Sequence, residues 1–127
     1  MPRVILVEAE EDVSAGVVDL LEDLGCSVVA FDSPTPALHF LQTTPPPDLL
    51  IVDLPLGSNR FQRQLINEVR KTGSESIALA MSAASTRGIS PIDWRVHAVL
   101  QKPFTAEQLE AVLGEVMEGQ GSTQRCA

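Results

Sequence analysis

The sequence predicts an α/β domain built on a parallel β-sheet with helices on both faces. Two short runs, residues 4–7 and 49–52, are continuously apolar, which is typical of strands that are buried on both sides. Strand-like and helix-like segments alternate five times along the chain without an internal repeat. Because parallel strands need crossover connections, this alternation predicts a single parallel sheet with right-handed connections and residues 49–53 near its centre.

Length, composition and charge fit one ordinary domain. The chain has 127 residues, 44% of them hydrophobic, and its net charge of −8 argues against direct nucleic-acid binding. No apolar stretch approaches the roughly 20 residues that span a bilayer, and the N-terminus lacks signal-peptide features. We therefore expect a cytoplasmic protein without membrane contact. The two cysteines have no metal-like spacing, and we expect no disulfide framework.

Each predicted strand is a short apolar or β-branched run that ends at a polar residue or a turn. In chain order these runs are residues 3–7, 27–31, 49–53, 76–81 and 96–101. Between them, apolar residues recur every three or four positions and predict helices with one inward face: residues 13–24, 37–41, 61–69 and 109–117. We interpret the basic residues of the third helix as a solvated face: Arg60, Arg63, Arg70 and Lys71.

Start and stop signals bound the first two helices. The acids among residues 8–12 lie at the start of the first helix, where they favour the positive end of its dipole, and Gly25 ends this helix. Asp32 or Ser33 is expected to cap the second helix, which begins with a proline in its first turn. Three consecutive prolines, residues 45–47, end that helix just before the central strand.

The C-terminal part contains the weakest and one of the clearest helix signals. Residues 86–95 hold a glycine and a proline that interrupt any helical pattern, so we expect only a short or distorted helix there. Trp94, in this segment, is open to two interpretations, a partner contact or a side chain that fills the space beside the short helix. Thr105 and Gln108 form a capping box that starts the last helix. Residues 119–127 are polar and are expected to form a flexible tail.

Four strand ends carry side chains that can take part in catalysis or ligand binding: Glu8, Asp53, Ser82 and Lys102. The carboxyl ends of parallel strands share one edge of the sheet, so these residues can meet although they are far apart in sequence. Carboxylates, a hydroxyl and an ammonium group suit a site that handles a phosphoryl group. Simpler interpretations stay open: Asp53 could cap the following loop, Lys102 could be a surface lysine, and serine is common at strand ends.

These strand ends and their neighbours resemble the receiver domain of two-component response regulators. The resemblance covers about residues 3–118 and rests on four motifs at matching spacings: VILVE at 4–8, LLIVD at 49–53, MSA at 81–83 and QKPFT at 101–105. It implies a flavodoxin-like (βα)5 fold with strand order 2-1-3-4-5. The domain would span residues 1–118, followed by the tail.

The resemblance also implies roles for individual residues. Asp53 matches the phosphoacceptor, Lys102 the lysine that contacts the phosphoryl group, and Ser82 the hydroxyl residue that moves toward it on activation. Glu8, Asp53 and the backbone carbonyl of Pro55 match positions that hold Mg²⁺ in the family. The peptide bond that follows the lysine is usually cis in the family.

Three positions depart from the family pattern, one of them Gly57, which stands where the family often has a proline. Ala9 stands where the family has a second acid, the direct Mg²⁺ ligand, and a methyl group cannot coordinate a hard cation. Glu8 or Glu10 could reach inward in its place, but the sequence predicts weak Mg²⁺ binding. Val99 falls at a position where an aromatic residue usually couples to the movement of the hydroxyl residue.

The resemblance implies a function in a bacterial two-component phosphorelay. The domain would accept a phosphoryl group on Asp53 from a sensor histidine kinase or a phosphotransfer protein and signal to a downstream protein effector. It would be no enzyme beyond its own phosphotransfer and dephosphorylation, and would act as a monomer or weak homodimer. The alternative is a pseudo-receiver, a protein-binding module that keeps the fold and works without phosphorylation. The departures at Ala9 and Val99 favour this alternative.

Overall fold

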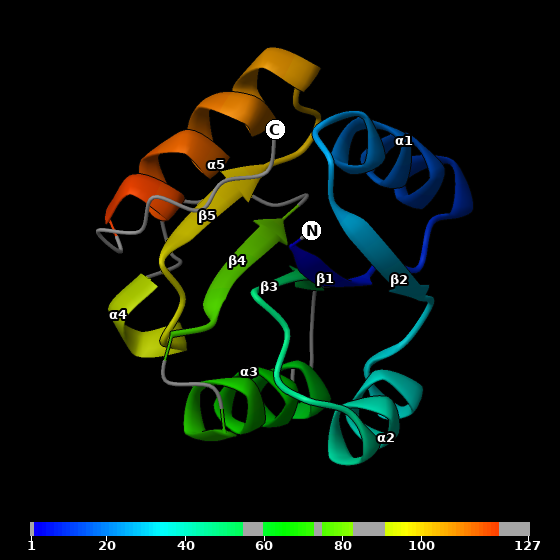
Figure 1. The fold of residues 1–127 in the computed structure, drawn as a ribbon, viewed down its shortest axis with the longest axis vertical. Coiled ribbons are helices and arrows are strands. Elements are labelled where there is room, and N and C mark those ends of the chain that lie inside the picture. The colour runs from blue at the N-terminus through cyan, green and yellow to red at the C-terminus, as the bar shows by residue number, and fades with distance from the viewer. Residues whose placement is uncertain (1, 55–59, 73–74, 83–90, 120–127) are drawn as a thin grey trace.

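The sheet and its helices form three layers. The computed structural model describes residues 2–54, 60–72, 75–82 and 91–119; for residues 118 and 119 it describes the backbone only. Its strands are β1 (Arg3–Val7), β2 (Ser27–Phe31), β3 (Leu49–Leu54), β4 (Ile77–Ser82) and β5 (Ala98–Gln101). Its helices are α1 (Glu11–Asp23), α2 (Pro34–Thr43), α3 (Arg60–Thr72), α4 (Pro91–Trp94) and α5 (Ala106–Gly119). All strand pairs are parallel in the order β2-β1-β3-β4-β5, which confirms the predicted order (Figure 1).

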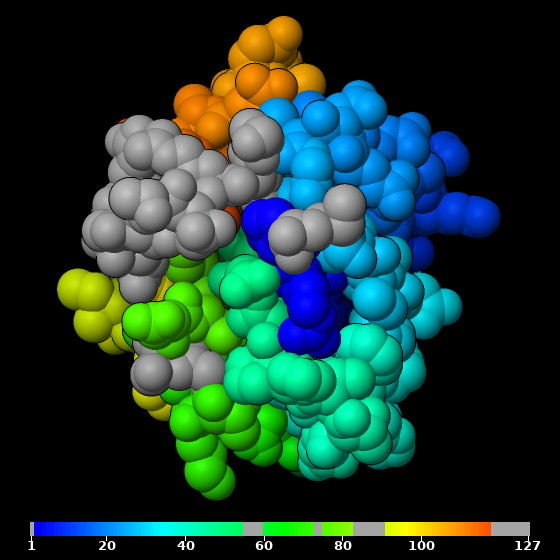
Figure 2. All heavy atoms as spheres, in the orientation of Figure 1, coloured from blue at the N-terminus to red at the C-terminus, as the bar shows by residue number. Residues whose placement is uncertain are grey.

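Alternate residues of the central strands face two separate cores. Along β1, Val4 and Leu6 pack with α1 and α5, whereas Ile5 and Val7 pack with α2 and α3. The same alternation runs along β3, whose residues 49–52 are all fully buried. With all atoms drawn, α1 and α5 fill the upper part of the molecule and α2 and α3 the lower part (Figure 2). We call the core beside α1 and α5 the upper core and the core beside α2 and α3 the lower core. The continuous apolar runs of the sequence therefore reflect burial on both faces, as expected.

Four predicted strand boundaries differ from the structure: the end of β3 and both ends of β4 by one residue, and the start of β5 by two. β3 continues through Leu54, which is 4% exposed and lies opposite Ser82, because its side chain still reaches the lower core. β4 starts at Ile77 and not at Ser76. The Ser76 hydroxyl donates a hydrogen bond to the Pro47 carbonyl at 2.6 Å, so this buried residue anchors the segment between α2 and β3.

Helix ends follow the sequence signals in part. The Thr105 Oγ1 accepts the Gln108 amide at 3.1 Å and Gln108 Oε1 accepts the Thr105 amide at 2.8 Å, which confirms the capping box. Ser33 occupies the N-cap position of α2, but its side chain makes no capping hydrogen bond. α4 has only four residues, as expected for this segment, although residues 86–90 lie outside the described part of the chain. Residues 120–127, the expected tail, also lie outside it.

The expectation of no disulfide is wrong for Cys26. This residue follows α1, is 4% exposed within the upper core, and is disulfide-bonded. The only other cysteine of the sequence, Cys126, lies outside the described residues. The spacing of cysteines in a sequence does not show which distant segments meet in space, so it could not predict this disulfide. None of the described helices is long and apolar enough to cross a membrane.

His97 joins three elements at the edge of the sheet opposite the carboxyl ends of the strands. The Ala78 amide donates to His97 Nδ1 at 3.1 Å, and an Arg70 guanidinium nitrogen lies 3.0 Å from Nε2. Partial burial, and then the positive charge of Arg70, hold the pKa of His97 below its ordinary value of 6.5. The neutral ring thus links the end of α3 to β4 and to the residues before β5.

This geometry predicts a pH dependence of stability. Because the pKa of His97 is lower in the folded state, the unfolded chain binds a proton at this residue first as the pH falls below about 6.5. The free energy of unfolding therefore decreases from that pH down to the pKa of the folded state. His97→Asn, whose side-chain oxygen can still accept the Ala78 amide, should flatten this slope in urea unfolding between pH 7.5 and 5. His39→Asn, at the chain's other, exposed histidine, is the control and should leave the slope intact. Equal slopes in the wild type and His97→Asn would contradict the prediction.

Candidate functional site

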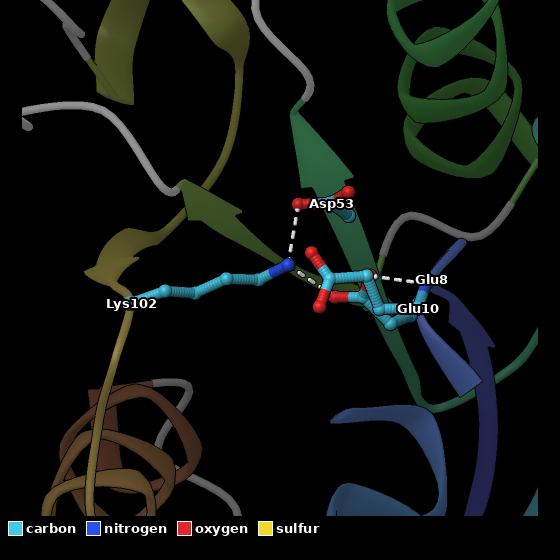
Figure 3. A network of polar contacts seen from close by, with 4 residues as sticks. All are labelled: Glu8, Glu10, Asp53 and Lys102. Carbon is cyan, nitrogen blue, oxygen red and sulfur yellow. Dashed lines mark hydrogen bonds and ion pairs between the residues drawn. The ribbon is translucent and has the colours of Figure 1, made fainter. Parts of the chain in front are cut away.

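Three charged side chains meet at the carboxyl edge of the sheet. The Lys102 ammonium forms ion pairs with Glu8 Oε1 and, at 2.9 Å, with Asp53 Oδ1, and so bridges the two carboxylates (Figure 3). Glu8 follows β1, Asp53 lies in β3 and Lys102 follows β5, so three strand ends contribute one residue each. Lys102 is therefore no free surface lysine.

Strand alternation explains why these three side chains meet. The residues two positions before them, Leu6, Ile51 and Leu100, all belong to the upper core with α1 and α5. Because side chains alternate between faces, Glu8, Asp53 and Lys102 continue the same upper face at the point where the strands end. Acids on two neighbouring strands thus face a cation from the far strand.

Burial makes the contacts of Glu8 energetically important. Glu8 is 2% exposed, and its second oxygen, Oε2, accepts the Glu10 amide at 2.9 Å, so both oxygens are in use. Its side chain and those of Lys102 and Asp53 are 0%, 13% and 17% exposed. Burial works to lower the pKa of Lys102, but hydrogen bonds and charge attraction from Glu8 and Asp53 outweigh it. The pKa of Lys102 therefore lies above its ordinary 10.5, and the ammonium group is charged at neutral pH.

Of the remaining features expected at the site, the structure describes Ser82 and the peptide bond after Lys102 but not Pro55. Ser82 ends β4 at the same edge, 1% exposed, and its carbonyl accepts the Lys102 amide at 2.7 Å. By strand alternation its side chain belongs to the opposite face from Asp53, since Met81, its neighbour, packs in the upper core. The Lys102–Pro103 peptide bond is cis, as the resemblance implied. Pro55, the third expected contributor to a metal site, lies outside the described residues.

The described residues do not form a complete magnesium site. Within the described ranges, no group of three or more His, Cys, Asp or Glu side chains is arranged to hold a metal ion. Ala9 offers no oxygen, and both Glu8 oxygens already accept hydrogen bonds. Glu10, the other residue expected to reach inward, contributes its backbone amide to Glu8. The cation that faces Asp53 in this arrangement is the Lys102 ammonium.

The geometry leaves one carboxylate oxygen available for chemistry. Asp53 Oδ1 pairs with Lys102, whereas Oδ2 has no hydrogen-bond partner among the residues that the structure describes. A partly exposed carboxylate oxygen beside a fixed ammonium group can attack an electrophile whose developing negative charge the ammonium then stabilises. Phosphoryl groups are electrophiles of this kind.

An apolar groove of about 600 Å³ lies beside the site, between α1 and the start of α5. Val13, Val17 and Leu20 line it from α1, and Phe104 and Leu109 from the other side. Its polar lining includes Lys102, which connects the groove to the three-residue site. Helical spacing made these side chains look like ordinary core residues, so sequence reasoning did not identify the groove.

Comparisons with known proteins agree with this architecture. Residues 4–114 match the family model described as the response regulator receiver domain. A CheY-like response regulator receiver domain from Methylobacillus flagellatus is 24% identical, with a TM-score of 0.74 over 91% of this chain and 98% of that one. A response regulator from Thermotoga maritima is 21% identical, with a TM-score of 0.79 over 93% and 98%.

A longer protein shares the same fold over part of its length. NtrX from Brucella abortus is 23% identical, with a TM-score of 0.79 over 94% of this chain but 28% of that protein. No curated protein matches the chain in sequence. At these identities the structural matches show the flavodoxin-like fold alone, and the family match extends over most of the chain.

Proposed function

The chain belongs to the response regulator receiver domain family, and on that premise we propose that it accepts a phosphoryl group on Asp53. The observation that carries the proposal is the pairing of Asp53 Oδ1 with the Lys102 ammonium at 2.9 Å, which leaves Oδ2 available. Glu8 stabilises this arrangement, because its ion pair with Lys102 holds the lysine at the carboxyl edge of the sheet.

The proposed reaction is an in-line phosphoryl transfer. Asp53 Oδ2 forms a bond to phosphorus as the bond between phosphorus and the donor nitrogen of a phosphohistidine breaks. The leaving imidazole keeps the electron pair and takes up a proton from water. Lys102 stabilises negative charge on the phosphoryl oxygens, and the product is an acyl phosphate. Hydrolysis of this acyl phosphate by water resets the site.

Magnesium would have a reduced role in this chain. Receiver domains generally bind Mg²⁺ in an acidic pocket. Here Glu8 and Asp53 are the two carboxylates that pair with Lys102, which lies between them. Mg²⁺ sheds its water reluctantly and depends on charged oxygen ligands, so its binding should be weak.

Labelling with a small phosphodonor tests the proposal. After incubation with phosphoramidate and Mg²⁺, the intact wild-type protein should gain the mass of one phosphoryl group, and Asp53→Asn should gain none. Asp19→Asn, at an exposed aspartate of α1, is the matched control and should label like the wild type. The assignment would be overturned if Asp53→Asn became labelled. It would also be overturned if the label on the wild type were stable to alkali, since an acyl phosphate is not.

A second candidate function is that of a pseudo-receiver. It is favoured by Ala9 and by the closed Glu8–Lys102–Asp53 arrangement, in which the acids are already neutralised in part. Val99 points the same way, because its aliphatic side chain packs beside the lower core and offers no ring that could switch. Under this alternative, folded wild-type protein would stay unlabelled in the same experiment.

The groove between α1 and α5 suggests how a phosphodonor protein would dock. Receiver domains interact with kinases, phosphotransfer proteins and effector domains. An apolar groove of about 600 Å³ beside Lys102 can accept the apolar face of a helix from such a partner. We propose that a donor of this type binds in this groove.

A further inference from the structure

α3 and the residues after α4 carry a basic stripe on an otherwise acidic domain. We use the name basic stripe for Arg60, Arg63, Lys71 and Arg95, all of them exposed. The first three are spaced by three and eight residues and so lie along one side of α3. The opposite side of the helix carries its buried residues, Leu65, Ile66 and Val69. The stripe extends over about 16 Å of helix.

The charge of the stripe is not neutralised within the described structure. The ion pairs among the described residues are those of Lys102, on the other side of the sheet. α3 and residues 91–95 hold five basic residues and two acids, Glu68 and Asp93, whereas the whole chain has a net charge of −8. α1, in contrast, holds five acids and no basic residue. The charge distribution is therefore strongly asymmetric.

Two of the arginines are held in place by contacts with their neighbours. The Arg63 guanidinium lies 3.8 Å from the centre of the Trp94 ring and donates to the Asp93 carbonyl at 3.2 Å. Arg95 donates to Asn67 Oδ1 at 3.4 Å, and these contacts place α4 against α3 (Figure 1). A guanidinium fixed in this way loses less freedom when a carboxylate binds to its remaining donors. Trp94 thus has a structural role as a support for Arg63.

We infer that the basic stripe is a docking surface for an acidic helical segment of another protein. This inference goes beyond the proposed phosphoryl transfer, because the stripe involves none of Glu8, Asp53 or Lys102. A helix with carboxylates every three or four residues could lie along α3 and place its acids opposite the arginines, which bind carboxylates through two parallel hydrogen bonds.

Charge complementarity favours such a segment over other anions. A nucleic-acid duplex carries one charge per about 1.7 Å and would extend beyond the stripe onto acidic surface. A second copy of this chain would bring its own net charge of −8. A short acidic segment can stay within the stripe and avoid both sources of repulsion.

A peptide titration tests the inference. Trp94 is the only tryptophan of the chain, so its fluorescence reports directly on the stripe when the peptide lacks aromatic residues. The probe is a synthetic alanine-based helix with glutamate at every fourth position, and its glutamine counterpart serves as control. We expect the glutamate peptide to bind saturably and the glutamine peptide not to bind. Arg60→Gln/Arg95→Gln should weaken it by about tenfold, as expected for two exposed ion pairs.

The matched control variant changes the net charge by the same amount elsewhere. Ala15→Glu/Ala111→Glu adds two acids at exposed positions of α1 and α5, where glutamate is a good helix former, and should bind like the wild type. An equal loss in this control, or equal binding of the glutamine peptide, would overturn the inference. So would tighter binding of a DNA duplex, or self-association that Arg60→Gln/Arg95→Gln abolishes. Asp53→Asn should bind the peptide normally, which separates this test from that of phosphoryl transfer.

Discussion

Replacing Lys102 with methionine is expected to lower the free energy of unfolding by about 3–5 kcal/mol. The lysine is the counter-ion of a fully buried Glu8 side chain and of Asp53. Methionine keeps most of the side-chain volume but leaves the Glu8 carboxylate uncompensated at the edge of the upper core. Because an unpaired buried charge is far more costly than an exposed one, the loss should be a large part of the stability of a domain of this size.

Urea unfolding of a small set of variants tests this expectation. Lys71→Met, at the chain's only other lysine, is exposed and should change the stability by less than about 0.5 kcal/mol. Adding Glu8→Gln to Lys102→Met should restore much of the loss, since it removes the uncompensated charge. A loss below about 1 kcal/mol would show that Glu8 is solvated in the folded state.

The variant Ala9→Asp is expected to bind Mg²⁺ on the order of tenfold more tightly than the wild type. It supplies the carboxylate that the family has at this position and lets a divalent cation compete with the Lys102 ammonium for the acidic edge. Labelling of Asp53 should become faster as well, because a divalent cation neutralises charge on the transferring phosphoryl group. Asp53→Asn should abolish labelling in either background.

The measurements are a Mg²⁺ titration and a timed labelling reaction on the two proteins side by side. Ala15→Asp, at an exposed position of α1, adds the same charge away from the site and should behave like the wild type. If the wild type matches Ala9→Asp in both measurements, Glu8 or Glu10 already provides the missing ligand. The domain would then be an ordinary receiver in its metal chemistry.

The fold was predictable because burial leaves a clear trace in a parallel sheet. Strands that are covered on both faces are uniformly apolar, and their alternation with helical spacing predicted the fold class. The strand order came from the resemblance to receiver domains. The boundaries were less predictable where tertiary contacts decide them. Leu54 continues β3 because its side chain reaches the lower core, and Ser76 leaves β4 because its hydroxyl binds the Pro47 carbonyl.

The membership of the site was predictable, but the pairing within it was not. Position at a strand end identified Glu8, Asp53 and Lys102, since the carboxyl ends of the strands meet at one edge. Glu8 was expected to hold a metal, whereas the structure pairs it with a lysine 94 residues away. The stacking of Arg63 on Trp94 also joins distant segments. Such pairings depend on side-chain conformations and shared burial, which leave no local pattern in a sequence.

The all-parallel sheet also has a consequence for the order in which the molecule forms. None of the strand pairs that the structure describes is a hairpin. The β4–β5 pairing joins residues 19 apart, as in Leu79 with Ala98, and the β1–β3 pairing joins residues 45 apart, as in Val4 with Leu49. Loop-closure entropy makes the longer closure more costly by about 0.8 kcal/mol and slows folding through non-local contacts. A folding intermediate built on β3, β4 and β5 would already hold Asp53 beside Lys102 but would lack Glu8. In such an intermediate the lysine would gain its second acid only when β1 docks.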